Sequence, residues 1–142
     1  MTFDTILVPV DGSEQSLRAL EKAAYIAGLS GADLTLLHVV DLNKKISSFE
    51  QVSTGGYIPL ELKEKGCQLL TDLRHRISAN IQTEIVVEIG NPAEIIVKYA
   101  KAHETDLIVI GNRGLGKLKQ VIMGSVSQYV LLRSSCTIMI VK

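Results

Sequence analysis

The 142-residue sequence predicts an α/β fold with a parallel sheet, and two patterns carry that prediction. Five short runs rich in β-branched residues have strand length, and they are almost continuously apolar, which is typical of strands covered on both faces. The segments between them repeat apolar residues at spacings of three and four, which is typical of helices. The five runs are residues 6–10, 34–40, 85–89, 107–110 and 138–141.

Four helices are predicted between these strands, and their ends carry recognisable signals. Ser13 is placed as an N-cap, and Asn91 followed by Pro92 has the order of a cap and a first helical residue. The expected helices run from Ser13 to Gly28 or Gly31, from Pro59 to about Ser78, from Asn91 onwards, and from about Gly124 to before Ser134.

Strand and helix alternate four times, which predicts one doubly wound domain spanning residues 1–142. Right-handed crossovers then place helices on both faces of the sheet, giving a three-layer Rossmann-like fold. The long irregular stretch from Asp41 to Ile58 is expected to be a surface loop or lid.

Composition argues against several classes of function. Lys plus Arg and Asp plus Glu number 15 each, and aromatic residues make up 4%, so nucleic-acid binding is not expected. The apolar runs are shorter than the ~20 residues of a membrane span, and the first ten residues do not resemble a secretory signal, so we expect a cytoplasmic protein without membrane insertion. Cys67 and Cys136 lack a partner at metal-ligand spacing and are expected to be buried or inert thiols.

The strongest candidate site is a glycine-rich loop after the fourth predicted strand. Gly111 and Gly114 are followed by nine residues and then by Gly124 and Ser125. Ligands of open α/β sheets bind beyond the carboxyl ends of the strands, and glycines at a helix start let backbone N–H groups approach an anion. The pattern therefore predicts a phosphate-binding loop, in which Arg113 adds positive charge.

Other interpretations of these residues stay open. The loop could be a turn whose glycines satisfy backbone geometry alone. A Walker A loop is disfavoured, because Leu118 stands where Ser or Thr should bind magnesium. A phosphoacceptor domain would suit Asp11 after the first strand but lacks the further acids, and Asp11 could also be a simple turn residue. His38 is expected to be a hydrogen-bonded core histidine.

No catalytic machinery follows from the spacing of the polar residues. Neither a Ser-His-Asp nor a Cys-His arrangement can be argued, and no paired carboxylates are apparent, so no catalytic residue is named. A module that only binds its ligand is therefore favoured. The alternative is an enzyme that uses the same pocket, either an ATP hydrolase or a nucleotidyl-transferring enzyme.

Three segments together resemble the ATP-binding branch of the universal stress protein family. They are the opening ILVPVDGS at residues 6–13, the LHVV at residues 37–40, and the G-2x-G-9x-G-[S/T] loop that starts at Gly111. The resemblance spans the chain from Ile6 to Val141. It implies a five-stranded parallel sheet of order 3-2-1-4-5, with ATP and Mg²⁺ across the exits of strands one and four.

The resemblance also implies roles for individual residues. Either Asp11 or Asp41 could hold the metal, and its ligands are otherwise unknown. At the base, the resemblance implies Pro9, Val10 and Val39 beside adenine and Ile110 closing the pocket, with Asp11 at the ribose or metal. At the ribose and phosphates it implies Gly111, Gly114, Gly124, Ser125, Val126 and Ser127. Asn112 and Arg113 belong to the same loop. The implied function is a nucleotide-dependent stress-response or signalling module that acts on unidentified protein partners.

A homodimer paired through the last strand is also expected. In the implied order this strand lies at the sheet edge, where its unpaired N–H and C=O groups invite a second copy. Residues 138–141 are wholly apolar, without a charge or proline that would discourage such pairing. Family members commonly dimerise through this strand, while a monomer with a tolerated edge is the alternative.

Overall fold

The computed structural model describes residues 2–42, 57–112 and 123–142. Its strands are β1 (Thr5–Pro9), β2 (Asp33–Val40), β3 (Thr83–Ile89), β4 (Leu107–Gly111) and β5 (Thr137–Val141). Its helices in these ranges are α1 (Glu14–Ser30), α4 (Tyr57–Arg74), α5 (Pro92–Ala102) and α6 (Ser125–Arg133). Most of the predicted lid and of the glycine-rich loop, including Arg113 and Gly114, lies outside the described residues.

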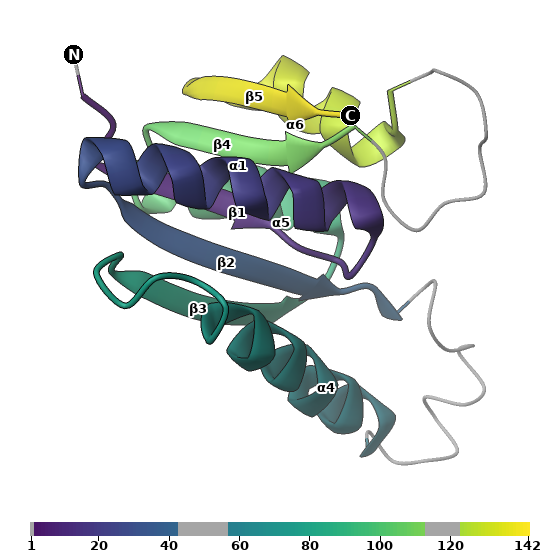
Figure 1. Cartoon of the computed structure of the whole chain (residues 1–142). Coiled ribbons are helices and arrows are strands. Elements are labelled where there is room, and N and C mark those ends of the chain that lie inside the picture. The colour runs from purple at the N-terminus through teal and green to yellow at the C-terminus, as the bar shows by residue number, and fades with distance from the viewer. Residues whose placement is uncertain (1, 43–56, 113–122) are drawn as a thin grey trace.

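The strands form one parallel sheet of order β3-β2-β1-β4-β5, which confirms the predicted topology. Helices α1 and α4 lie in front of the sheet in Figure 1, and α5 and α6 lie behind it. This three-layer arrangement follows from right-handed crossovers, because the chain moves outward from β1 to β3 and then returns to the other side of β1.

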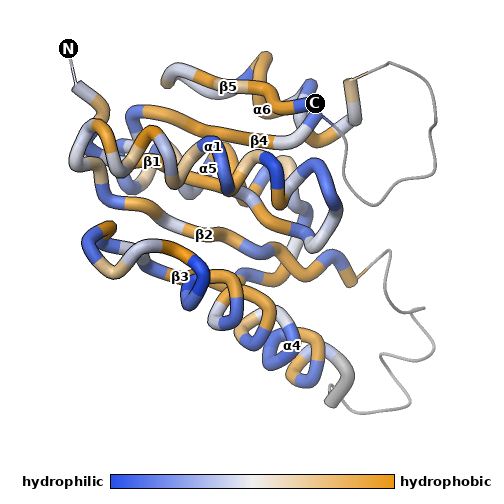
Figure 2. The backbone as a smooth tube through the Cα atoms, viewed as in Figure 1, coloured by the Kyte–Doolittle hydropathy of each residue, from blue (hydrophilic) through white to orange (hydrophobic). Residues whose placement is uncertain are grey.

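Two apolar clusters hold the three layers together, one on each face of the sheet. Alternate residues of β1 serve different clusters: Ile6 and Val8 pack toward α1 and α4, whereas Leu7 packs toward α5 and α6. Apolar colour predominates on β4 and β5 in Figure 2, whereas hydrophilic positions interrupt β2 and β3. All five residues of β4 are buried, but the edge strands β3 and β5 each leave residues exposed. The expectation that every strand is covered on both faces is therefore wrong at the two edges.

The helix ends agree with the cap signals but shift some boundaries. Ser13 caps α1 by accepting a hydrogen bond from the Ser16 amide at 3.2 Å. Gly31 ends this helix in the left-handed region, at φ 78°, so Gly28 lies inside it. The helix predicted to run from Pro59 to Ser78 is α4, which ends at Arg74; shortly after it, the amides of Arg76 and Ile77 bond three residues back instead of four.

The predicted state of the cysteines is only partly confirmed. Both are free thiols, and Cys67 is exposed on α4, so of the expected states, buried or inert, burial does not apply to it. Cys136 is half-buried, and this burial raises the pKa of its thiol. Among the residues that the structure describes, no helix is long and apolar enough to cross a membrane.

Hydrogen bonds to the carboxylate of Asp106 join the beginning of β1 to the beginning of β4. It accepts hydrogen bonds from the backbone amides of Asp4 and Thr5, at 2.9 and 3.0 Å, and from the Thr5 hydroxyl at 3.3 Å. These donors lower the pKa of Asp106 because they favour the charged carboxylate, and the Asp4 amide has the largest effect.

We expect Asp106 to stabilise the fold in a pH-dependent way. Its folded pKa lies below the unfolded value of about 3.9, so its contribution is complete above that value and is lost as the pH falls through the folded pKa. Asp106→Asn should therefore lower the free energy of unfolding at pH 7 more than at pH 3, measured by urea denaturation. Glu21→Gln, at an exposed position of α1, is the control, and a difference that does not change with pH would contradict the expectation.

Candidate functional site

The candidate site lies where β1 and β4 end, side by side at the carboxyl edge of the sheet. Parallel strands all end at one edge, so Asp11 after β1, Asp41 after β2 and Gly111 at the end of β4 are brought to it. The strand order reverses between β1 and β4, since the chain extends to β2 and β3 on one side and to β4 and β5 on the other. Open α/β sheets bind their ligands at such a reversal.

The turn that leaves β1 is fixed by hydrogen bonds on both of its sides. The Val10 amide donates to Leu37 O at 2.8 Å, and Val10 O lies 2.7 Å from Nδ1 of His38. Oδ1 of Asp11 accepts from the Ser13 amide at 2.9 Å, and Gly12 between them is left-handed, at φ 87°. Asp11 thus takes part in the turn, and His38 is hydrogen-bonded as expected, although it is half-buried instead of lying in the core.

The end of β4 lies so close to α1 that it has no room for a side chain. A Cβ atom on Gly111 would lie 2.8 Å from Cβ and 2.9 Å from the carbonyl carbon of Gln15. Both distances are shorter than real Cβ contacts, and one of the two atoms belongs to the backbone. Gly111 is therefore needed for helix packing, whatever its role toward a ligand.

Asn112 ties the end of β4 to the start of α6. Its amide donates to Val141 O at 2.8 Å, and its carbonyl oxygen accepts from the Gly124 amide at 2.6 Å and from the Ser127 hydroxyl at 2.8 Å. Ser127 is buried, and the same hydroxyl lies 3.0 Å from Gly124 O. The two ends of the predicted loop are thus held together by one carbonyl group.

The N-cap residue of α6 differs from those of α1 and α5 in making no side-chain hydrogen bond to its helix. The side chains of Ser13 and Asn91 cap α1 and α5, whereas the N-cap of α6 is Gly124, which has no side chain. The first amides of a helix have no intrahelical partner and point along the axis past the N-terminus. The amides of Ser125 and Val126 are in this position, next to Gly124, whose own amide donates to Asn112 O at the end of β4.

The apolar residues of the predicted site fall on two faces of the sheet. Val39, Ile110 and Val126 all belong to the cluster under α5 and α6, and Pro9 is half-buried. The Val10 side chain instead lies in the opposite cluster, under α1, and is 2% exposed. Three of the residues expected near a base or ribose thus lie on the same face of the sheet, but for Val10 only the backbone lies at the site.

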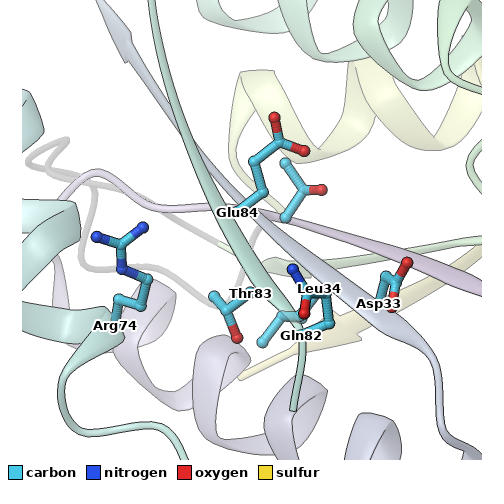
Figure 3. A pocket seen from close by; sticks show the side chains of 7 residues that line it. Asp33, Leu34, Arg74, Gln82, Thr83 and Glu84 are labelled. Atoms are coloured by element: carbon cyan, nitrogen blue, oxygen red, sulfur yellow. The ribbon is translucent and has the colours of Figure 1, made fainter. Parts of the chain in front are cut away.

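A cavity of about 280 Å³ lies at the other end of the sheet, where β2 and β3 begin. Arg74 and Glu84 project on opposite sides of β3 and do not converge on one ligand position (Figure 3). The cavity is lined by Asp33, Leu34, Thr35, Arg74, Gln82, Thr83 and Glu84. It is therefore separate from the strand exits. Within the described ranges, no three His, Cys, Asp or Glu residues are grouped as metal ligands.

Sequence reasoning missed the contacts that shape the site, namely Gln15 against Gly111 and the His38 bond to Val10. Neither contact follows from a local pattern, because each joins residues far apart in the chain. One residue in the sequence does indicate a close contact with α4, because Gly66 lies in the interior of a predicted helix, where glycine is unfavourable. In the structure, Gly66 packs against the His38 ring.

Known proteins agree with this fold over nearly the whole chain. The model of the universal stress protein family matches residues 2–142. The chain is 32% identical to universal stress protein YxiE of Bacillus subtilis, over 99% of both chains. It is similar to the solved structure of UspA from Lactobacillus plantarum, at 27% identity and a TM-score of 0.86, covering 100% and 99% of the two chains.

A further solved structure is described as a universal stress protein in complex with cAMP. It is 26% identical to this chain, with a TM-score of 0.70, and 100% of this chain and 98% of that one are covered. A family model that spans almost every residue, a close relative of the same length and a matching strand order agree with one another. The chain belongs to the universal stress protein family.

Proposed function

We propose that this protein binds ATP with Mg²⁺ between the exits of β1 and β4. The observation that carries the proposal is the N-terminus of α6, which Gly124 leaves without a side-chain cap at the edge where β4 ends. Amides at a helix start, which have no intrahelical partner, are donors well suited to phosphate. The relative described as a cAMP complex supports an adenine nucleotide as the ligand class.

Each part of the nucleotide has a proposed partner among the described residues. Val39 and Ile110, which belong to one apolar cluster, would contact the adenine together with Pro9. The amides and hydroxyl at the start of α6 would bind phosphates, where Ser125 is exposed. The Asp11 carboxylate would meet the ribose or the metal, because Mg²⁺ in nucleotide sites is held by one or two carboxylates and by phosphate oxygens.

The biological role proposed for this site is that of a nucleotide-dependent stress-response or signalling module. ATP shifts a protein between states only by binding one of them more tightly, so the nucleotide would change which protein partners are bound. Calorimetric titration of the purified protein with ATP and Mg²⁺ tests the binding step, after mass spectrometry of the denatured protein has checked for nucleotide that copurifies. Failure to bind added ATP, with no nucleotide carried over, would refute the proposal.

A homodimer through β5 is proposed on a separate observation. This strand lies at the edge of the sheet, and Met139 on it is 37% exposed. Val141 O accepts from Asn112, which shows that residue 141 bonds toward β4. Backbone groups alternate in direction along a strand, so the N–H and C=O of Ile138 and Ile140 point outward, where a second copy can pair with them.

We expect Ile138→Pro to prevent this pairing, because proline removes an outward N–H while the amides that face β4 are kept. Sedimentation at micromolar concentration should give a mass near twice 15.5 kDa for the wild-type protein and near 15.5 kDa for the variant. Circular dichroism checks that the variant is folded. A wild-type monomer, both with and without ATP, would exclude the dimer without affecting the nucleotide proposal.

A further inference from the structure

A glycine in the interior of α4 makes room for the ring of His38. Glycine is among the least favourable residues inside a helix, so a buried glycine at position 66 needs a reason. A Cβ atom there would lie 2.6 Å from Cδ2 of His38 and 3.2 Å from a methyl carbon of Val87. The first distance is too short for any real contact, and the atom it meets is part of a rigid ring. Helix α4 therefore fits against β2 only because residue 66 has no side chain.

The ring that Gly66 accommodates is bonded to the backbone at the exit of β1. Nδ1 of His38 lies 2.7 Å from Val10 O, and a carbonyl oxygen only accepts, so Nδ1 carries the proton. That oxygen belongs to the peptide group that joins Val10 to Asp11. The bond consequently fixes the orientation of the peptide plane from which Asp11 and the rest of the exit turn continue.

We propose that His38, seated by Gly66, is a positioning residue for the nucleotide site and couples the placement of α4 to the exit turn of β1. This inference rests on the proposed function, because the site that it concerns is the proposed nucleotide site. His38 itself is assigned no contact with the nucleotide. It acts through the Val10 carbonyl on Asp11. A displacement of α4 relative to β2 would press on the ring and disturb the turn, so a partner that binds α4 could alter nucleotide affinity from that face of the sheet.

Two pairs of variants test the coupling by calorimetry with ATP and Mg²⁺. His38→Leu removes the donor, and we expect it to weaken binding about tenfold. His38→Asn places an amide nitrogen where Nδ1 lies and should stay within about threefold of the wild-type affinity. Gly66→Ala should weaken binding like His38→Leu, whereas Gly28→Ala should not change it, because the nearest atom to its new Cβ is 3.9 Å away.

Wild-type affinity in His38→Leu, or an equal loss in His38→Asn, would overturn the inference. Gly66→Ala tests the same coupling only if it folds, which circular dichroism establishes, and the His38 pair does not depend on that outcome.

A measurement without nucleotide separates this inference from the proposed function. Imidazole ¹⁵N spectra of the wild-type protein should show His38 with its proton on Nδ1, and the Asp11 amide signal should shift in His38→Leu but much less in His38→Asn. A proton on Nε2 in the neutral ring, or an Asp11 signal unmoved in both variants, would refute the positioning role. If the spectra behave as expected but ATP does not bind, the proposed function fails while the structural coupling stands.

Discussion

Replacing Gly124 by valine is expected to weaken ATP binding by at least about a hundredfold, since charged phosphate oxygens would lose two or more amide donors. Gly124 is the residue before the first turn of α6, and a branched side chain there would occupy the space in which phosphate meets the backbone. The fold should survive, because the glycine has φ −64° and ψ 158°, which any residue adopts. Calorimetry measures the affinity, and circular dichroism checks the fold.

Gly124→Ser gives this prediction a sharper control. A serine at the N-cap should accept a hydrogen bond from its own helix, as Ser13 does in α1. It should stabilise α6 by about a few tenths of a kcal/mol relative to glycine and compete with phosphate for the same amides. Affinity and stability would then change in opposite directions. If both variants bind ATP as the wild type does, the phosphate does not lie at the start of α6.

Gly111→Ala is expected to lower the free energy of unfolding by about 1–3 kcal/mol, as overpacking does in a close-packed core. The new Cβ would lie 2.8 Å from a side-chain atom and 2.9 Å from a backbone atom of Gln15 in α1, so β4 or the first turn of α1 must move. Urea denaturation of the protein without nucleotide measures this cost independently of any ligand.

Gly28→Ala, in the helix α1 that also contains Gln15, is the matched control for the Gly111 variant. Its Cβ would meet nothing closer than Ile81, at 3.9 Å, and alanine is a better helix former by up to about 1 kcal/mol. The control should therefore be neutral or stabilising. An equal loss of stability in both variants would mean that the close approach of Gln15 is not the cause.

The fold could be predicted to a large extent because its signals are local. Strand runs, the cap at Ser13 and the Asn91-Pro92 start each depend on a few neighbouring residues, and each is found in the structure. The order of the strands came from the resemblance to a family. Local patterns could not decide between Gly28 and Gly31 as the end of α1, because either glycine can adopt a left-handed conformation.

The candidate site could be predicted only as a set of residues. Its glycines and strand exits are visible in the sequence, but the carbonyl of Asn112, which holds the start of α6, is not. The same is true of the approach of Gln15 to Gly111 and of His38 to Val10. These contacts involve backbone atoms, which every residue possesses, and residue type therefore carries little information about them.

The parallel sheet has an electrostatic consequence for a chain whose formal net charge is zero. Helices α1, α4, α5 and α6 each follow a strand, so all four begin at the carboxyl edge, and their aligned peptide dipoles place roughly half a positive charge at each N-terminus. Glu14 and Glu94 in the first turns of α1 and α5 offset part of this field, whereas α4 and α6 have no acidic residue in their first turns. The neutral molecule is thus polarised toward an anion at this edge, at the starts of α4 and α6. Because this field comes from the main chain, neither pH nor the loss of any lysine removes it while the fold is intact.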